Sequence, residues 1–345
     1  MKIQRCKGTR DMYPADMRSF RFVEDKFREK CIEAGYEEVR TSTIEHLHLF
    51  TSTGTLTPSR LRGVYSFLDW DGWSGERVVL RPDGTIPIAR LYVETMTDKK
   101  LAKLCYVTNV FSFEQTGVEA RERWQCGAEL IGAGSAKADL EIVNMAVDVL
   151  HNVGLKDIKV KLSHAGLIRN LLSEFRLNHE EQDKVFDRIL DGDLSDLNRL
   201  NPERPGLVKT LSQLLEMKGK SAGFLKNMKA LLKKDLPGVE APFNNFIDVV
   251  NRLETAGCAC EIDITSGRGF EYYTGMIFRL FAGDIEVGGG GRYDALIPLL
   301  GGPDTPALGF ALYFDCLTGL INSQPSARRP GSRKSPAGRK SRVAV

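Results

Sequence analysis

Strand-like segments lie on both sides of a long helical segment, and this arrangement strongly limits the possible folds. Residues from about 165 to 255 are rich in Leu, Lys, Glu and Asp, with helical periodicity and little strand pattern. Strand patterns precede this segment at 109–132 and return after it at 260–281 and 285–300. We therefore expect an α+β fold, in which one mixed, largely antiparallel sheet is flanked by helices and carries a helical insertion.

The second strand of the stretch 109–132 shows the clearest alternation. Successive side chains of a strand point to opposite faces. One face would carry Trp124, Cys126, Ala128 and Leu130, and the other Arg123, Gln125, Gly127 and Glu129. A face with Arg, Gln and Glu around a glycine is typical of the floor of a polar pocket.

Other elements follow from local patterns. Gly154 is well placed to end a helix, and the pair Asp71–Gly72 favours a hairpin turn. The expected elements are a helix over 16–33, a strand after Gly35 within 35–50, a hairpin over 64–84, a helix beginning near Pro87, a helix over 135–154 and a short strand over 157–165.

Composition limits the class of protein. The chain of 345 residues has no run of about 18 apolar residues, so we expect no membrane span. Its first residues lack the apolar core of a secretory signal, and its seven scattered cysteines indicate a reducing, cytoplasmic environment. Cys258 and Cys260 have no second ligand pair at zinc spacing, and the five histidines form no metal motif. We expect neither a metal nor a cofactor.

The positive charge is concentrated at the C-terminus. The net charge is +3, but residues 323–345 carry seven Lys or Arg and no acidic residue, which leaves −4 for the remainder. A mildly acidic body gives no electrostatic footprint for nucleic acid, and we expect none as a partner. The sequence predicts one domain over 1–322 and a disordered basic tail over 323–345.

Two further stretches indicate a site. The glycines of 287–296 (VGGGGRYDAL) lack the spacing of a phosphate-binding loop and indicate that a ligand or another backbone passes close to them. The stretch 268–275 (RGFEYYTG) combines Arg, Glu and two tyrosines, which suit either recognition of a small polar molecule or a half-buried sheet edge.

Taken together, five motifs resemble the catalytic domain of histidyl-tRNA synthetase, a class II aminoacyl-tRNA synthetase. They are KGTRDMYP at 7–14, RPDGT at 81–85, RWQCGAELIG at 123–132, RGFEYYTG at 268–275 and GGRYDAL at 290–296. The resemblance extends over roughly residues 5 to 320. It implies an antiparallel sheet with flanking helices, a helical insertion, and dimerisation through the first helix and strand.

The resemblance also implies a pocket for histidine. Asp83, Thr85, Gln125 and Glu129 would meet the α-amino group and imidazole, Tyr272 and Tyr273 would complete the imidazole pocket, and Arg268 would face the carboxylate.

The chain departs from the synthetases where they hold ATP. Ser112 stands at the position of the arginine that clamps the α-phosphate, and Cys316 replaces the second clamping arginine. Tyr313 fills a glycine position where ATP would lie, and Ser42 replaces a proline of the dimer interface. Removing one preorganised donor of this kind costs about 10²–10³ in rate. We therefore expect no adenylate chemistry and no catalytic residues.

A chain that keeps the histidine pocket but lacks both phosphate-clamping arginines resembles the regulatory subunit of ATP phosphoribosyltransferase, a synthetase paralogue in the first step of histidine biosynthesis. This resemblance implies a homodimer within a hetero-oligomer that contains a short-form catalytic subunit, with histidine as the inhibitory effector. Histidine would occupy either the synthetase-like pocket or a subunit interface. The alternatives are a divergent or truncated histidyl-tRNA synthetase, and a stand-alone histidine- or tRNA-binding paralogue.

Overall fold

The structure, a computed structural model, covers most of the chain. It describes residues 3–323 apart from 57–59, 71–74, 115, 117, 174, 176, 191–204, 233–236 and 267–271. The helices are α1 (Pro14–Glu33), α2 (Leu47–Thr51), α3 (Thr85–Thr95), α4 (Ala136–Asn152), α5 (Ala165–Ser173), α6 (His179–Leu190), α7 (Pro205–Glu216), α8 (Ala222–Leu232), α9 (Glu240–Thr255), α10 (Leu296–Leu299) and α11 (Phe314–Ser323), with 3-10 turns η1 (Arg60–Gly63) and η3 (Pro237–Val239). The strands are β1 (Glu37–Glu38), β2 (Ile44–His46), β3 (Ser66–Trp70), β4 (Gly75–Leu80), β5 (Ala102–Phe111), β6 (Glu122–Ile131), β7 (Ile158–His164), β8 (Lys218–Gly219), β9 (Cys260–Asp263), β10 (Met276–Ala282), β11 (Ile285–Arg292) and β12 (Ala307–Tyr313).

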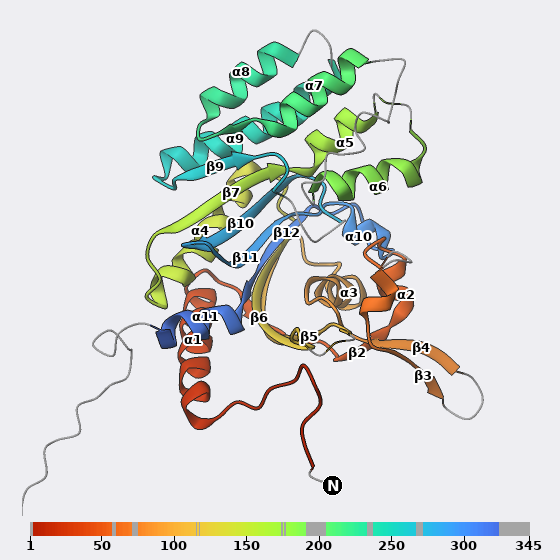
Figure 1. The fold of residues 1–345 in the computed structure, drawn as a ribbon, viewed down its shortest axis with the longest axis vertical. Helices are drawn as coiled ribbons and strands as arrows, with labels where there is room; N and C mark the ends of the chain where they lie inside the picture. The colour runs from red at the N-terminus through yellow and green to blue at the C-terminus, as the bar shows by residue number, and fades with distance from the viewer. Residues whose placement is uncertain are drawn as a thin grey trace, which may run out of the picture.

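One large sheet forms the centre of the molecule (Figure 1). Its nine strands in the described part of the chain lie in the order β1-β5-β6-β12-β11-β10-β7-β9-β8. All neighbours are antiparallel except the pairs β1–β5 and β7–β9. The predicted mixed, largely antiparallel sheet is confirmed, and strands from both sides of the helical segment lie next to each other in it. A smaller sheet, β2-β4-β3, projects beside it (Figure 1).

The two faces of the sheet have different covers. Helices α1, α4 and α11 contact β6 on one side, whereas α3 contacts it from the other. The ring of Trp124 lies edge-on to that of Phe20 in α1, with centroids 5.2 Å apart, which fixes the orientation of β6. Cys126 and Leu130 are buried on the same face, as the alternation predicts. Gln125 and Glu129 therefore point toward α3.

The described residues between 165 and 255 are mainly helical. They form α5 to α9, with the two-residue strand β8 added to the edge of the large sheet. Helix α9 packs against α4, α5 and α8, and it buries Phe243 and Phe246 completely. This helical layer lies at the end of the sheet opposite α1 (Figure 1).

The prediction of one strand after Gly35 is wrong in part. The structure has two short strands, β1 and β2, followed by α2. Between the two strands, the Nη1 of the buried Arg81 donates to the carbonyls of Thr41 at 3.0 Å and Ser42 at 2.8 Å. Here the backbone is bound by a side chain from a distant part of the sequence, which no pattern within 35–50 indicates.

The glycines of β11 are explained by neighbouring strands. Strand β11 lies between β10 and β12, with Gly290 opposite Phe278 on one side and Phe310 on the other. A Cβ at Gly290 would lie 2.1 Å from the carbonyl oxygen of Gly309. Of the two possibilities left open by the sequence, close approach of another backbone is therefore the one found here.

Several predictions fall outside the described residues. They concern the turn at Asp71–Gly72, Arg268, and the tail from residue 324 onward. Ser323, expected as the first residue of the tail, is the last residue of α11. Among the described helices, none has the length and apolar character needed to span a bilayer.

Replacement of Gly290 by Ala is expected to lower the free energy of unfolding by about 1–3 kcal/mol, the usual cost of overfilling a packed interior. Urea denaturation would measure this change. Gly319→Ala is the matched control, because nothing lies within 4 Å of a Cβ added there in α11. The control is expected to be stabilising by up to about 1 kcal/mol. Similar effects of both substitutions would contradict the close approach of β12.

Candidate functional site

The sequence-predicted site residues converge on the face of the sheet that α3 covers. Asp83 and Thr85 lie at the start of α3, and Gln125 and Glu129 come from β6. Tyr272 and Tyr273 precede β10. The structure thus brings together the following six of the seven predicted residues: Asp83, Thr85, Gln125, Glu129, Tyr272 and Tyr273. The seventh, Arg268, lies outside the described residues.

Glu129 is at the centre of this cluster. Its side chain is buried, with the residue 1% exposed, and its Oε1 accepts a hydrogen bond from Thr85 Oγ1 at 2.8 Å. The hydroxyl of Tyr293 donates to Oε2. A Cβ at Gly309, the residue opposite in β12, would lie 1.7 Å from Oε2, so only glycine leaves space for this carboxylate. Burial raises the pKa of Glu129 to about 8, although both hydrogen bonds oppose the shift.

Asp83 is the second carboxylate of the cluster, and it is half-buried. Its Oδ1 accepts from the backbone N–H of Ile86 at 2.8 Å, which satisfies a free donor at the start of α3. Its Oδ2 accepts a long hydrogen bond of 3.5 Å from the hydroxyl of Tyr272. Burial raises the pKa of Asp83 to about 6, again against its hydrogen bonds. Two carboxyl groups and several phenols therefore lie close together, and this grouping favours a ligand that carries N–H groups or a positive charge.

The tyrosines form the wall opposite β6. Tyr272 and Tyr273 are each 5% exposed, and their rings are edge-on with centroids 5.2 Å apart. Tyr272 makes a second edge-on contact with Tyr293 at 5.6 Å. Burial raises the pKa of all three phenols well above the ordinary value, so they act as neutral hydrogen-bonding groups.

Two pocket residues were missed by the sequence reasoning. Tyr293 was seen only as part of the glycine-rich motif, and Tyr106 was not singled out. Tyr106 in β5 lies opposite Gly127, and a Cβ there would be 2.5 Å from its hydroxyl oxygen. This hydroxyl accepts from Gln125 Nε2 at 3.5 Å. The glycine in β6 therefore does make room, as predicted, and what fills the room is Tyr106 from the neighbouring strand.

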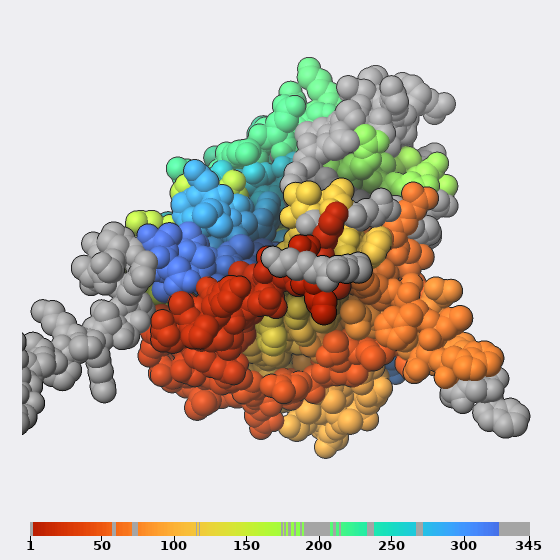
Figure 2. Space-filling model, turned by 60° about the horizontal axis from the view of Figure 1, so that its bottom comes forward, coloured from red at the N-terminus to blue at the C-terminus, as the bar shows by residue number. Residues whose placement is uncertain are grey.

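A cavity of about 640 Å³ adjoins the pocket. Asp83 and Gln125 belong to its lining as well as to the pocket, and Tyr313 and Cys316 line it farther along. The N-terminal segment crosses near its edge, where Arg121 N donates to Gly8 O at 2.8 Å. Figure 2 shows this segment (red) lying across the strands β5 and β6 (yellow).

Tyr313 forms part of the wall of this cavity. The expectation that it occupies the place of ATP stays a prediction. Two arginines of the lining are paired with acidic neighbours, Arg10 with Asp315 and Arg123 with Glu119, the latter at 3.7 Å. The expectation of no adenylate chemistry therefore rests on the missing arginines and not on the size of this cavity.

The two clamp positions carry side chains that cannot neutralise a phosphate. Ser112 lines a smaller cavity of about 340 Å³, and its hydroxyl donates to Ala120 O at 3.4 Å. Burial raises the pKa of the Cys316 thiol, so this group is neutral at physiological pH. Within the described residues, no cluster of three or more His, Cys, Asp or Glu side chains is arranged to hold a metal ion.

Comparisons with known proteins agree with this geometry. A family model described as histidyl-tRNA synthetase matches residues 8–317. An ATP phosphoribosyltransferase regulatory subunit from Dehalococcoides mccartyi is 53% identical over 93% of this chain and 78% of its own length. A histidine–tRNA ligase from Methanocaldococcus jannaschii is 36% identical over 91% of this chain and 74% of its own.

The solved structures are similar as well. A structure described as an ATP phosphoribosyltransferase regulatory subunit/histidyl-tRNA synthetase from Bacillus halodurans C has a TM-score of 0.79 at 26% identity, over 92% of this chain and 83% of that one. Apo histidyl-tRNA synthetase from S. aureus has a TM-score of 0.64 at 25% identity, over 93% and 74%. The predicted class II synthetase-like fold is confirmed, and so is the resemblance to the regulatory subunit.

The raised pKa values predict how stability depends on pH. Folding raises the pKa of Glu129 to about 8 and of Asp83 to about 6, from about 4 in an unfolded chain. Each protonated carboxyl therefore stabilises the folded state fully below pH of about 4, and this contribution declines as the pH rises toward the folded pKa. Of the two, mainly Glu129 titrates between pH 6 and 8. The unfolding free energy should fall there by up to about 1.4 kcal/mol per pH unit.

Glu129→Gln keeps a neutral side chain of the same size and is expected to remove this slope in ligand-free protein. Urea denaturation at several pH values from 6 to 8 would measure it. Glu94→Gln, on the exposed end of α3, is the matched control and should retain the wild-type slope. Parallel pH profiles for wild type and Glu129→Gln would contradict the raised pKa.

Proposed function

We propose a regulatory and non-catalytic function for this chain, which belongs to the histidyl-tRNA synthetase family. Its role would be that of a regulatory subunit of ATP phosphoribosyltransferase, because relatives at 53% identity have this name. One observation supports the proposal: a polar pocket formed by six of the seven predicted residues coexists with Ser112 and Cys316 at the two positions of the phosphate clamps. Such a chain retains what is needed to bind an amino acid and lacks what is needed to activate it.

Free histidine is the ligand that we propose for the pocket. An imidazole N–H and an α-ammonium group are both donors, and Glu129 and Asp83 supply carboxylate acceptors in a site shielded from water. Gln125 adds an amide, and the edge-on rings of Tyr272 and Tyr273 offer apolar walls for a flat ring. Arg268 is proposed to meet the ligand carboxylate. The α-ammonium group of histidine is charged, and a hydrogen bond to a charged group contributes about 1.5–3 kcal/mol. We therefore expect Glu129, with both its oxygens in the cluster, to contribute most to affinity.

The partner that we propose is a short-form catalytic ATP phosphoribosyltransferase. This chain would form a homodimer within the hetero-oligomer, enable catalysis by the partner and transmit inhibition by histidine. A ligand shifts an equilibrium only when it binds one state more tightly than the other. Histidine must therefore distinguish an active from an inactive arrangement of the subunits.

Histidine binding provides a direct test of the pocket. Wild-type protein is expected to bind histidine in isothermal titration calorimetry, and Glu129→Gln should raise the Kd by about 10- to 100-fold, the equivalent of one lost hydrogen bond to the charged ligand. Glu94→Gln should bind like wild type, since this residue is exposed at the far end of α3. Unchanged affinity in Glu129→Gln would place histidine elsewhere, such as at a subunit interface.

Reconstitution tests the regulatory role. The chain would be mixed with a short-form catalytic subunit, and phosphoribosyl-ATP formation from ATP and phosphoribosyl pyrophosphate would be followed. We expect activity only in the mixture, co-elution of the two proteins in size-exclusion chromatography, and inhibition by added histidine. Glu129→Gln should still activate the partner but need about 10- to 100-fold more histidine for inhibition. A mixture that neither co-elutes nor becomes active would contradict the proposal.

A divergent histidyl-tRNA synthetase is the rival function, favoured by the 36% identity to a histidine–tRNA ligase. The same preparation can decide between them. Histidine-dependent exchange of pyrophosphate into ATP would support the rival. We expect none, because removal of a single transition-state donor typically lowers the rate about 10²–10³-fold and two clamps are replaced here.

A further inference from the structure

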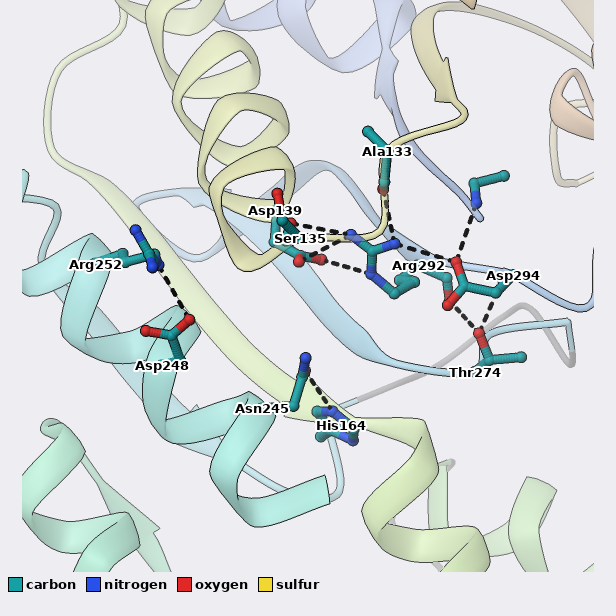
Figure 3. A network of polar contacts seen from close by, with 11 residues as sticks. Ala133, Ser135, Asp139, His164, Asn245, Asp248, Arg252, Thr274, Arg292 and Asp294 are labelled. Carbon is teal, nitrogen blue, oxygen red and sulfur yellow. Dashed lines mark hydrogen bonds and ion pairs between the residues drawn. The ribbon is translucent and has the colours of Figure 1, made fainter. Parts of the chain in front are cut away.

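Arg292, the last residue of β11, is held by an unusually complete set of partners. It is 4% exposed, and its Nε and Nη2 donate to the two carboxylate oxygens of Asp139 at 3.1 and 2.9 Å. Nη1 donates to Ala133 O at 3.0 Å and to Asp294 Oδ1 at 3.1 Å, and Nη2 also reaches Ser135 O at 3.4 Å. A guanidinium has five N–H donors, so every one of them has an acceptor here. Figure 3 shows this arrangement at the start of α4.

The backbone of Arg292 holds the tyrosine wall of the pocket. Its carbonyl accepts hydrogen bonds from the backbone N–H of Thr274 at 2.8 Å and of Gly275 at 3.3 Å. A Cβ at Gly275 would lie 2.9 Å from Arg292 Cδ, so the side chain and the wall segment are in close contact. Thr274 follows directly after Tyr272 and Tyr273. The place of this wall relative to β11 is therefore set at Arg292.

The two residues that follow extend the connection into the pocket. The hydroxyl of Tyr293 donates to Glu129, and its backbone N–H donates to Ala307 O at 2.7 Å. Asp294, which accepts from Arg292, also accepts from Ala307 N at 3.0 Å, and its own N–H donates to Thr274 Oγ1 at 2.9 Å. Tyr293 is thus enclosed between two residues that are fixed to the same guanidinium network.

We propose that Arg292 is a positioning residue of the ligand pocket, which acts through Tyr293 and the 272–275 wall although the described hydrogen bonds of its own side chain are made outside the pocket. The inference rests on the proposed function in that it takes Glu129 as the ligand-binding carboxylate. The guanidinium network at α4 sets the direction in which the Tyr293 hydroxyl points. This direction in turn sets the hydrogen-bond geometry of Glu129.

Lysine cannot replace this group. A guanidinium is planar and presents a rigid fork that matches both oxygens of Asp139, whereas an ammonium is a single point with three donors. In Arg292→Lys the buried Asp139 would lose one of two bonds, and the carbonyls of Ala133 and Ser135 would compete for the remaining donors. The charge is retained, so the change isolates geometry from electrostatics.

A double-mutant cycle on histidine affinity tests the proposal. Arg292→Lys and Tyr293→Phe are each expected to raise the Kd by about ten-fold, equal to about 1.4 kcal/mol. If Arg292 acts through Tyr293, the double variant should be no more than about three-fold worse than the weaker-binding single variant. Independent effects would multiply to about 100-fold. Arg252→Lys is the control, because Arg252 makes an exposed pair with Asp248 on α9 and should leave affinity unchanged (Figure 3).

The outcomes are distinct. Non-additive losses support the positioning role, and multiplied losses or an unchanged Kd in Arg292→Lys overturn it.

Should Arg292→Lys fail to fold, Asp294→Ala takes its place in the cycle, since Asp294 is partly exposed and accepts a hydrogen bond from the same guanidinium. If wild-type protein binds no histidine, the proposed function fails, but the inference is still tested by the same cycle on urea unfolding of ligand-free protein. Additive unfolding free energies would then overturn it.

Discussion

A carboxylate buried in the middle of the large sheet sets conditions that much of the structure must meet. Glu129 has almost no contact with water, so its oxygens require donors from the protein, and these come from Thr85 on α3 and Tyr293 after β11. It also requires space, which Gly309 in β12 leaves. A buried polar group without hydrogen-bond partners would cost about 2–7 kcal/mol. The positions of α3, β11 and β12 around β6 are therefore linked through one side chain.

In the proposed function, the pocket binds a ligand and the neighbouring cavity supports no chemistry. The described side of the pocket proposed for an amino acid has hydrogen-bond donors, two carboxyl groups and aromatic walls, and burial keeps the tyrosines neutral and raises the pKa of both carboxyls. The Cys316 thiol lines the adjoining cavity and the Ser112 hydroxyl lines the smaller one, so neither position proposed as a phosphate clamp carries an arginine. Binding requires only complementarity to a ground state, whereas acceleration requires charge placed for a transition state. A chain can lose the second and keep the first.

The pocket wall also touches the helical layer. The N–H of Gly275 donates to the carbonyl of Arg292. The carbonyl of Gly275 accepts a hydrogen bond from the N–H of Ala165, the first residue of α5. Nearby, the ring of His164 accepts from Leu167 N through Nδ1 and meets Asn245 of α9 at 3.2 Å through Nε2 (Figure 3). Burial lowers the pKa of His164 to about 4, so this ring remains neutral at physiological pH. The wall is therefore attached to the sheet on one side and to the helices on the other.

The features that could be predicted from the sequence are those with a local period or a local motif. The alternation in β6 separated Trp124 from Gln125 and Glu129 correctly, since a strand has a period of two residues whatever it packs against. The helix patterns likewise placed α1 and α4. Other contacts follow only from the tertiary structure. Tyr106 fills the space beside Gly127, and Tyr293 binds Glu129 across 164 residues of chain. Arg81 binds the backbone between β1 and β2. These contacts depend on which strands become neighbours, and strand order is set by burial and pairing over the whole sheet, which no local pattern records.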